Sequence, residues 1–240
     1  MPDARRSRWP ARAAGPTLLV LAIAACAPGA ASPAAPPGSG GRPGAGRPAG
    51  PTAGQLRGAL LTTINGQPPA SPVESGAYGS LAQVEAAENA VNGVIVRPPA
   101  CARATVTGFG LRSFAAVPAT ISTFRVGGNG ISEMLLAPPP AAATRALGPQ
   151  IPAGCARYTA TVNGHTFVYL ASEQVVRHLG QAARALHIRA AGAASLDVWS
   201  VVYRGRDFIG VVTIAGPGAS AGAVTALAAQ AYAHAAGTLH

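Results

Sequence analysis

Short runs in which apolar and polar residues alternate occupy the middle and the second half of the chain, and turn-forming residues separate them in pairs. Alternation with a period of two predicts β-strands, and paired runs around a short turn predict hairpins. The three expected hairpins pair residues 120–126 with 131–136, 156–162 with 165–170, and 196–203 with 207–214. Their turns are residues 127–130, 163–164 and 204–206. The middle turn is Asn163-Gly164, a dipeptide that favours hairpins because both positions tolerate positive φ.

Apolar residues spaced three or four positions apart predict helices in the remaining segments. The expected helices cover residues 55–63, 81–91, 138–148, 175–186 and 221–237. Ser220 stands directly before the last of them, where its hydroxyl is expected to cap the first turn. The face of this helix that is expected to be buried consists of Val224, Leu227, Ala228, Ala231 and Ala235. Hairpins with helices between and after them predict an α+β domain. We expect an antiparallel sheet of about six strands, covered on one face by helices, with the C-terminal helix packed on it.

The segment before this domain has a different composition. Residues 27–54 contain no apolar residue larger than alanine or proline. Such a segment has no side chains for a core, and we expect it to be a disordered tether. The sequence therefore divides into residues 1–25, a linker of residues 26–54 that begins with Cys26, and one folded domain of residues 55–240.

The tether begins at a cysteine that follows the sequence Ile23-Ala24-Ala25. Arginines near the N-terminus and the apolar stretch 18–25 come before it, and this stretch is shorter than the roughly 20 residues that cross a bilayer. The arrangement resembles the signal peptides of bacterial lipoproteins. The resemblance implies that the chain is cut before Cys26, that the Cys26 thiol carries a lipid, and that the protein is anchored on the extracytoplasmic face of the cell membrane. The alternative is an ordinary secretory signal with a chance cysteine.

The chain is strongly basic, with a formal net charge of +10, and it contains no lysine. After residue 25 the arginines are dispersed, whereas nucleic-acid-binding proteins cluster basic residues beside aromatic side chains that stack on bases. No nucleic-acid partner is therefore expected, and the charge favours a solvated surface with a weak attraction to anionic lipid or cell-wall polymer. The abundance of alanine, glycine, proline and arginine is typical of a GC-rich genome and indicates an actinobacterial source.

Two further cysteines, Cys101 and Cys155, lie in the expected folded domain. An even pair of cysteines in an exported chain predicts a disulfide, because the compartment is oxidising. Two alternatives are weaker. A catalytic cysteine would leave the second cysteine unexplained, and a zinc site would need histidines clustered around the pair. In the chain-entropy model, a bond across about 54 residues contributes roughly 4 kcal/mol of stability.

Several features of residues 80–240 together resemble a known family. They are a cysteine preceded by prolines in segment 98–101 (PPAC), the segment 154–157 (GCAR), the strand-rich middle, and a final strand pair followed by an alanine-rich helix. This part of the chain resembles the extracytoplasmic sensor domain of mycobacterial receptor serine/threonine kinases and its free-standing lipoprotein relatives. The resemblance implies an α+β fold with an antiparallel sheet and a cleft for an unidentified ligand. Kinase-linked members usually carry two disulfides, whereas this chain can form one, and it carries no kinase segment, which leaves a signalling role open.

Residues 218–222 match the G-x-S-x-G pattern of serine hydrolases, with Ser220 at the position of the nucleophile. The hydrolase hypothesis is weak, because that fold requires an acid and then a histidine after the serine, and no acidic residue follows Asp207. A helix cap explains Ser220 without a further assumption. The histidines do not cluster, and His178 and His187 are expected around one helix, that of residues 175–186. We therefore expect no catalytic residue, no metal site and no cofactor.

The remaining polar and aromatic residues have structural explanations. Glu133 lies within an expected strand and is expected to face solvent, with a position in a cleft as the alternative. Asp197 and Asp207 are expected to pair with Arg204 and Arg206 across the last hairpin. The aromatic residues of the adjacent strands are expected in the core, with the rim of a cleft as the alternative. These residues are Phe167, Tyr169, Trp199, Tyr203 and Phe208.

Three hypotheses for the function remain. The first is a non-catalytic, membrane-tethered domain outside the cytoplasm that binds a small ligand or an envelope component, as a sensor domain does. The second is a carrier of lipid or glycolipid in the envelope, which requires a large apolar cavity. The third is a secreted serine hydrolase, which requires Ser220 beside a histidine and an acid. The sequence favours the first.

Overall fold

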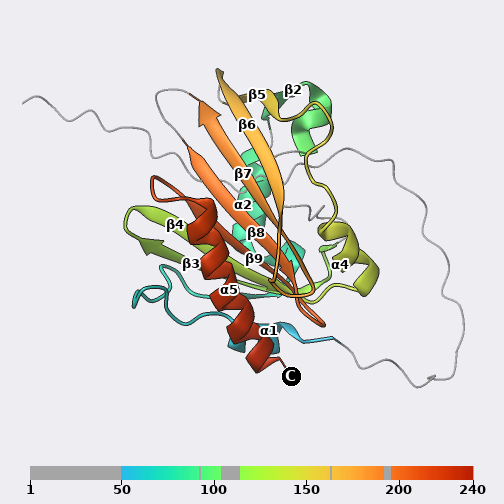
Figure 1. Cartoon of the computed structure of the whole chain (residues 1–240), viewed down its shortest axis with the longest axis vertical. Helices are drawn as coiled ribbons and strands as arrows, with labels where there is room; N and C mark the ends of the chain where they lie inside the picture. The colour runs from blue at the N-terminus through green and yellow to red at the C-terminus, as the bar shows by residue number, and fades with distance from the viewer. Residues whose placement is uncertain (1–49, 92, 104–113, 163, 192–195, 240) are drawn as a thin grey trace, which may run out of the picture.

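A nine-stranded antiparallel sheet forms the centre of the molecule (Figure 1). The computed structural model describes residues 50–91, 93–103, 114–162, 164–191 and 196–239. The strands are β1 (Glu74–Ala77), β2 (Ile95–Arg97), β3 (Pro118–Val126), β4 (Asn129–Leu136), β5 (Arg157–Val162), β6 (His165–Val176), β7 (Ala182–Ala191), β8 (Asp197–Arg204) and β9 (Ile209–Ala215). Their order across the sheet is β1-β3-β4-β9-β8-β7-β6-β5-β2, so the two shortest strands lie at its two ends.

Each of the three expected hairpins is present. β3 pairs with β4 around Gly127 and Gly128, whose φ angles of 56° and 81° lie in the left-handed region that glycine tolerates. β5 pairs with β6, and Gly164 in their turn has a φ of 79°. Asn163, the other residue of that expected turn, lies outside the described residues. β8 pairs with β9, with Arg204 opposite Ile209.

The segment 175–186, expected as a helix, belongs instead to a fourth hairpin. β6 and β7 pair with Val176 opposite Ala183. The helix prediction was wrong because apolar residues three and four positions apart also arise when the end of one strand, a turn and the next strand follow one another. Gly180 lies in the turn with a φ of 60°, and a Cβ there would overlap the carbonyl oxygen of Arg204. The sheet therefore has nine strands rather than about six, because β7 and the short β1 and β2 were not predicted.

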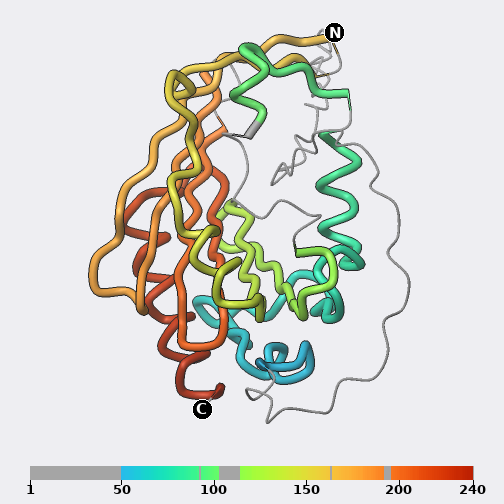
Figure 2. Tube along the Cα trace, turned by 90° about the vertical axis from the view of Figure 1, so that its right-hand side faces the viewer, coloured from blue at the N-terminus to red at the C-terminus, as the bar shows by residue number. Residues whose placement is uncertain are grey.

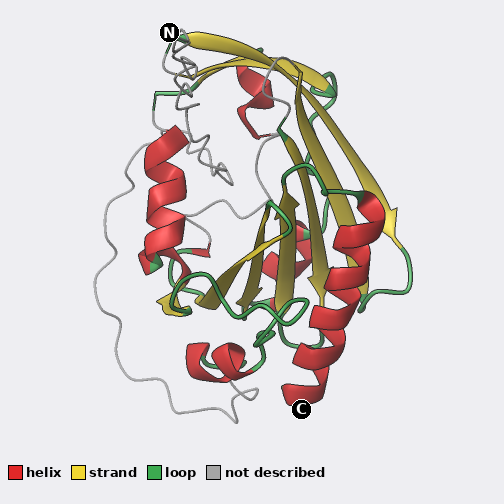
Figure 3. Cartoon of the chain, turned by 90° about the vertical axis from the view of Figure 1, so that its left-hand side faces the viewer, coloured by secondary structure: helices red, strands yellow, loops and turns green. Residues whose placement is uncertain are grey.

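Helices cover both faces of the sheet, whereas the sequence predicted cover on one face. The helices are α1 (Ala53–Gly58), α2 (Ala82–Val91), α4 (Pro140–Ala146) and α5 (Ala221–Thr238), with the short 3-10 helices η1 (Tyr78–Ser80) and η2 (Pro99–Arg103). α1 and α5 share one core cluster with the sheet, and η1, α2 and α4 share another. Figures 2 and 3 show the sheet between α5 on one side and α2 on the other.

The C-terminal helix α5 agrees with its prediction. The hydroxyl of Ser220 accepts a hydrogen bond from the backbone N–H of Ala223 at 3.2 Å, so this serine caps the helix. The residues expected on its inner face are all buried: Val224, Leu227, Ala228, Ala231 and Ala235. The first helix differs more, because α1 begins at Ala53, inside the segment expected as tether, and Thr52 and Gln55 cap it reciprocally.

Cys101 and Cys155 form the predicted disulfide, with their Cα atoms 5.3 Å apart. The bond joins η2 to the segment that leads into β5, and it lies in a small core cluster with Tyr158 and Ala171. Cys26, the expected lipidation site, lies outside the described residues. Within the part of the chain that the structure describes, no helix has the length and apolar character of a membrane span.

Candidate ligand-binding site

The turn between β6 and β7 packs tightly against the end of β8. The backbone N–H of Gln181 donates to the carbonyl of Arg204 at 2.8 Å, and the side chain of Leu179 is buried in the core cluster that includes α5. His178 has a φ of 61°, in the left-handed region that few non-glycine residues occupy. The side chains of Arg177 and His178 are exposed on this turn, which the bond to Arg204 and the burial of Leu179 hold in place.

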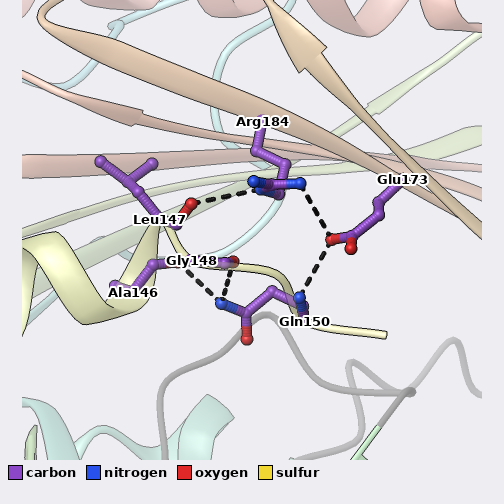
Figure 4. Close-up of polar contacts among 6 residues, drawn as sticks. All are labelled: Ala146, Leu147, Gly148, Gln150, Glu173 and Arg184. Atoms are coloured by element: carbon purple, nitrogen blue, oxygen red, sulfur yellow. Dashed lines mark hydrogen bonds and ion pairs between the residues drawn. The ribbon is translucent and has the colours of Figure 1, made fainter. Parts of the chain in front are cut away.

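A polar network ties the β6–β7 hairpin to the segment after α4 (Figure 4). Nη1 of Arg184 lies 3.4 Å from Oε2 of Glu173, and Nε of Arg184 donates to the carbonyl of Leu147 at 3.2 Å. The same carboxylate oxygen accepts a hydrogen bond from the backbone N–H of Gln150 at 3.0 Å. The side chains of the ion pair are 20% and 17% exposed, so solvent screens this pair less than a fully exposed one. The network holds residues 147–150 beside the two strands.

Side chains also satisfy the carbonyls at the end of α4, which have no partner within the helix. Nε2 of Gln150 donates to the carbonyls of Ala146 and Gly148 at 3.1 and 2.7 Å. Nη1 of Arg204 donates to the hydroxyl of Thr144 at 3.0 Å. The bond between Arg204 and Thr144 fastens α4 to β8, and the bonds of Gln150 cap the end of the helix.

An open pocket of about 410 Å³ lies between the end of α4 and the β6–β7 turn. Its apolar lining consists of Leu147, Val175, Val176, Leu179, Ala182 and Ala183. Its cationic side chains are Arg177, Arg184 and, when protonated, His178. Glu173 neutralises Arg184, whereas neither Arg177 nor His178 makes an ion pair with a described residue. An apolar wall beside unpaired positive charge suits a small molecule with an apolar body and an anionic group.

Among the residues that the sequence singled out, only His178 lines this pocket. His187 lies on β7, not on a helix with His178, and its Nε2 is 2.6 Å from Oδ1 of Asp197. The expected pairing of Asp197 with an arginine is therefore wrong. His187 also stacks on Trp199, with ring centroids 4.1 Å apart. Of the five aromatic residues considered for the core, two are buried and three are partly buried. The buried ones are Tyr203 and Phe208, and the partly buried ones are Phe167, Tyr169 and Trp199.

The structure also shows where Asp207, Ser220 and the possible metal ligands lie. Asp207 pairs with its neighbour Arg206 at 3.8 Å, and both side chains are exposed. Ser220 is the helix cap already described, and in the described residues no histidine or carboxylate is bonded to it. The described residues contain no cluster of three or more histidine, cysteine, aspartate or glutamate side chains that could hold a metal ion.

Glu133 is buried, with 1% of its surface exposed, so the prediction that it faces solvent is wrong. The reason is that both faces of the sheet are covered, and β4 therefore has no solvent-facing side at this position. Oε2 of Glu133 accepts a hydrogen bond from the backbone N–H of Leu61 at 2.9 Å. Burial raises the pKa of Glu133 to about 7, and the bond from Leu61 opposes this rise.

Other buried polar groups lie near Glu133. Ser122 is its cross-strand partner on β3, so the two side chains share one face of the sheet. Burial, and then the charge of Glu133, raise the pKa of Tyr203 well above its ordinary value. Oε1 of Glu133, the hydroxyl of Ser122 and the hydroxyl of Tyr203 have no hydrogen-bond partner among the described residues. The interior thus contains a polar cluster that none of the sequence patterns indicated.

The structure is similar to two solved mycobacterial structures, and no family model or curated protein matches the sequence. One is the crystal structure of the extracellular domain of PknH from Mycobacterium tuberculosis, with a TM-score of 0.49 and 13% identity over 79% of this chain and 97% of that chain. The other is an X-ray structure of a putative uncharacterized protein, the Rv0999 ortholog from Mycobacterium smegmatis, with a TM-score of 0.40 and 13% identity over 80% and 98%.

Proposed function

We propose that this chain is a membrane-anchored extracytoplasmic lipoprotein whose folded domain binds a ligand without catalysing a reaction, as a sensor domain does. The observation that carries the proposal is the pocket between α4 and the β6–β7 turn, which joins an apolar wall to Arg177 and the imidazole of His178, neither of which forms an ion pair with a described residue. The ligand is expected to be a small molecule with an apolar body and an anionic group.

The proposed anchor is a lipid on Cys26, which the sequence pattern before this residue supports. The disulfide between Cys101 and Cys155 agrees with export, because such bonds persist in oxidising compartments. The segment between Cys26 and α1, rich in alanine, glycine and proline, would let the domain move outside the membrane within a distance set by the tether.

The two other functions receive less support from the described residues. A lipid carrier requires a large apolar cavity, whereas the described pocket is open and bears cationic side chains. A serine hydrolase requires a general base beside Ser220, and the hydrogen bond that this hydroxyl makes is with the N–H of Ala223. The cap explains the position of Ser220 at the start of α5 without a catalytic role.

Mass spectrometry of the full chain, purified from the organism that makes it, tests the proposal. Under native conditions we expect a co-purifying molecule of constant mass. Under denaturing conditions we expect a diacylglyceryl modification on Cys26. The double variant Val175→Asp, Arg177→Glu places negative charge in the pocket and should lose the co-purifying molecule.

Arg125→Glu serves as the control, because Arg125 is exposed on β3 and does not line the pocket. The control should keep the molecule. Wild-type protein without any co-purifying molecule, or loss of the molecule from both variants, would contradict the ligand site. An unmodified Cys26 would contradict the anchor.

A further inference from the structure

The described residues cover one part of the sheet on a single face only. α5 contacts β7, β8 and β9, and in Figure 1 β5 and β6 continue beyond its upper end. The opposite face of this outer part is covered by the cluster around the Cys101–Cys155 disulfide. On the α5 side, exposed residues follow one another along β2, β5, β6 and β7. Five of them form what we call the arginine face: Ile95, Arg97, Arg157, Leu170 and Arg189.

The strand register places these five side chains on one side of the sheet. Leu170 on β6 is opposite both Arg157 on β5 and Arg189 on β7, so an arginine flanks it on each neighbouring strand at about 5 Å. Arg97 on β2 is opposite Thr159, which follows Arg157 by two residues and therefore faces the same way.

The arginine face has an excess of positive charge. No described carboxylate lies within ion-pair distance of Arg97, Arg157 or Arg189. Asp197 is opposite Arg189 across the β7–β8 ladder, but its carboxylate is bonded to His187 at 2.6 Å. The guanidinium groups are thus available to anionic groups outside the protein.

The same face exposes large apolar side chains. Ile95 is 56% exposed and Leu170 is 38% exposed. Arginines around exposed aliphatic side chains complement a surface that offers anionic groups above an apolar layer.

We propose that the arginine face docks on an anionic lipid bilayer. The three arginines contact lipid headgroups, while Leu170 and Ile95 reach into the apolar boundary beneath them. An anionic cell-wall polymer would satisfy the arginines but would leave both aliphatic side chains in water. The inference rests on the proposed location at a membrane, and it adds that the folded domain itself lies against the lipid surface.

Vesicle binding of the full chain with Cys26→Ser tests this inference without any contribution from the covalent lipid. We expect sedimentation with vesicles of phosphatidylcholine and phosphatidylglycerol, weaker sedimentation with phosphatidylcholine alone, and loss of binding at high salt. Replacing Arg97, Arg157 and Arg189 by glutamine should weaken binding to the anionic vesicles about a hundredfold, at about fivefold for each arginine. Leu170→Ser should weaken it about tenfold.

The matched control replaces Arg57, Arg125 and Arg145 by glutamine, because these arginines are exposed elsewhere and the change in net charge is the same. Equal weakening in both triple variants would overturn the proposal in favour of nonspecific attraction. Binding to dextran sulfate in solution without binding to vesicles would overturn it in favour of a polymer. Because the lipid on Cys26 is scored separately by mass, failure of this docking surface is distinguishable from failure of the proposed anchor.

Discussion

At the scale of single residues, Glu133 is a carboxyl group buried in the core, where its charged form is unfavourable. A carboxylate in the core loses its hydration, and here a single hydrogen bond from Leu61 compensates part of that loss. Alternation along a strand shows which residues share a side, but it does not show whether that side is covered. The sequence missed the burial of Glu133 because its side of β4, which it shares with Ile131 and Leu135, is covered by the cluster around α1 and α5, and Leu61, its hydrogen-bond partner, lies 72 positions away in the sequence.

The raised pKa of Glu133 makes stability depend on pH. The folded-state pKa of about 7 lies above the ordinary value of 4.5, so the folded protein is favoured below pH 4.5 and loses stability as the pH rises to 7. The loss is on the order of 3 kcal/mol. Glu133→Gln keeps an acceptor for Leu61 and should remove this slope, leaving the variant more stable than wild type at pH 8. Urea unfolding at pH 4.5 and pH 8 measures the effect, with the exposed Glu85→Gln as control. Parallel pH dependence in wild type and Glu133→Gln would refute it.

At the scale of elements, prediction succeeded where one local signal was sufficient. The glycine turns define the β3–β4 and β5–β6 hairpins, and the apolar stripe and cap of α5 define its position. Prediction failed for the β6–β7 hairpin, and the candidate pocket was missed with it, because this turn forms one wall of the pocket. Gly180 was the available signal, since glycine is unfavourable within a helix and favourable in a turn with positive φ. β1 and β2, of four and three residues, are too short to show the alternation of apolar and polar residues that predicts a strand.

The cap of α5 gives a prediction for this element. Ser220→Ala leaves the N–H of Ala223 without its acceptor and should lower the free energy of unfolding by about 1 kcal/mol. Ser220→Asp keeps an acceptor at the positive end of the helix dipole and should retain wild-type stability. Thermal denaturation of the three proteins compares them. Equal stability of the alanine and wild-type proteins would show that the cap contributes nothing, and labelling of Ser220 by a fluorophosphonate would restore the hydrolase hypothesis.

At the scale of the whole molecule, the disulfide has a more local role than its separation of 54 residues in sequence implies. Cys101 follows β2 closely, and β2 already pairs with β5, just after Cys155. The bond therefore reinforces one end of the sheet and the small core cluster beneath it.

Reduction of this disulfide should destabilise the domain by about 4 kcal/mol in the chain-entropy model. Hydrogen exchange should accelerate first at residues 95–103, because β2 and η2 depend on the bond more than the central strands do. Urea unfolding with and without a reducing agent measures the total effect, and peptide-resolved exchange locates it. Unfolding curves that coincide, or exchange that accelerates evenly across the sheet, would contradict the local role.

The order of the strands has a consequence for molecules that meet at high density. The sheet ends in β1, of four residues, and β2, of three, so each border offers few unpaired backbone groups. Pro98 and Pro99 directly follow β2 and have no N–H to donate. Among the described residues, the open runs beyond these short strands are residues 122–126 of β3 and 172–176 of β6, so a second copy finds at most five residues along which to extend the hydrogen-bond ladder. We therefore expect crowded chains to remain separate and not to polymerise into continuous sheets, even though each contains long strands in its interior.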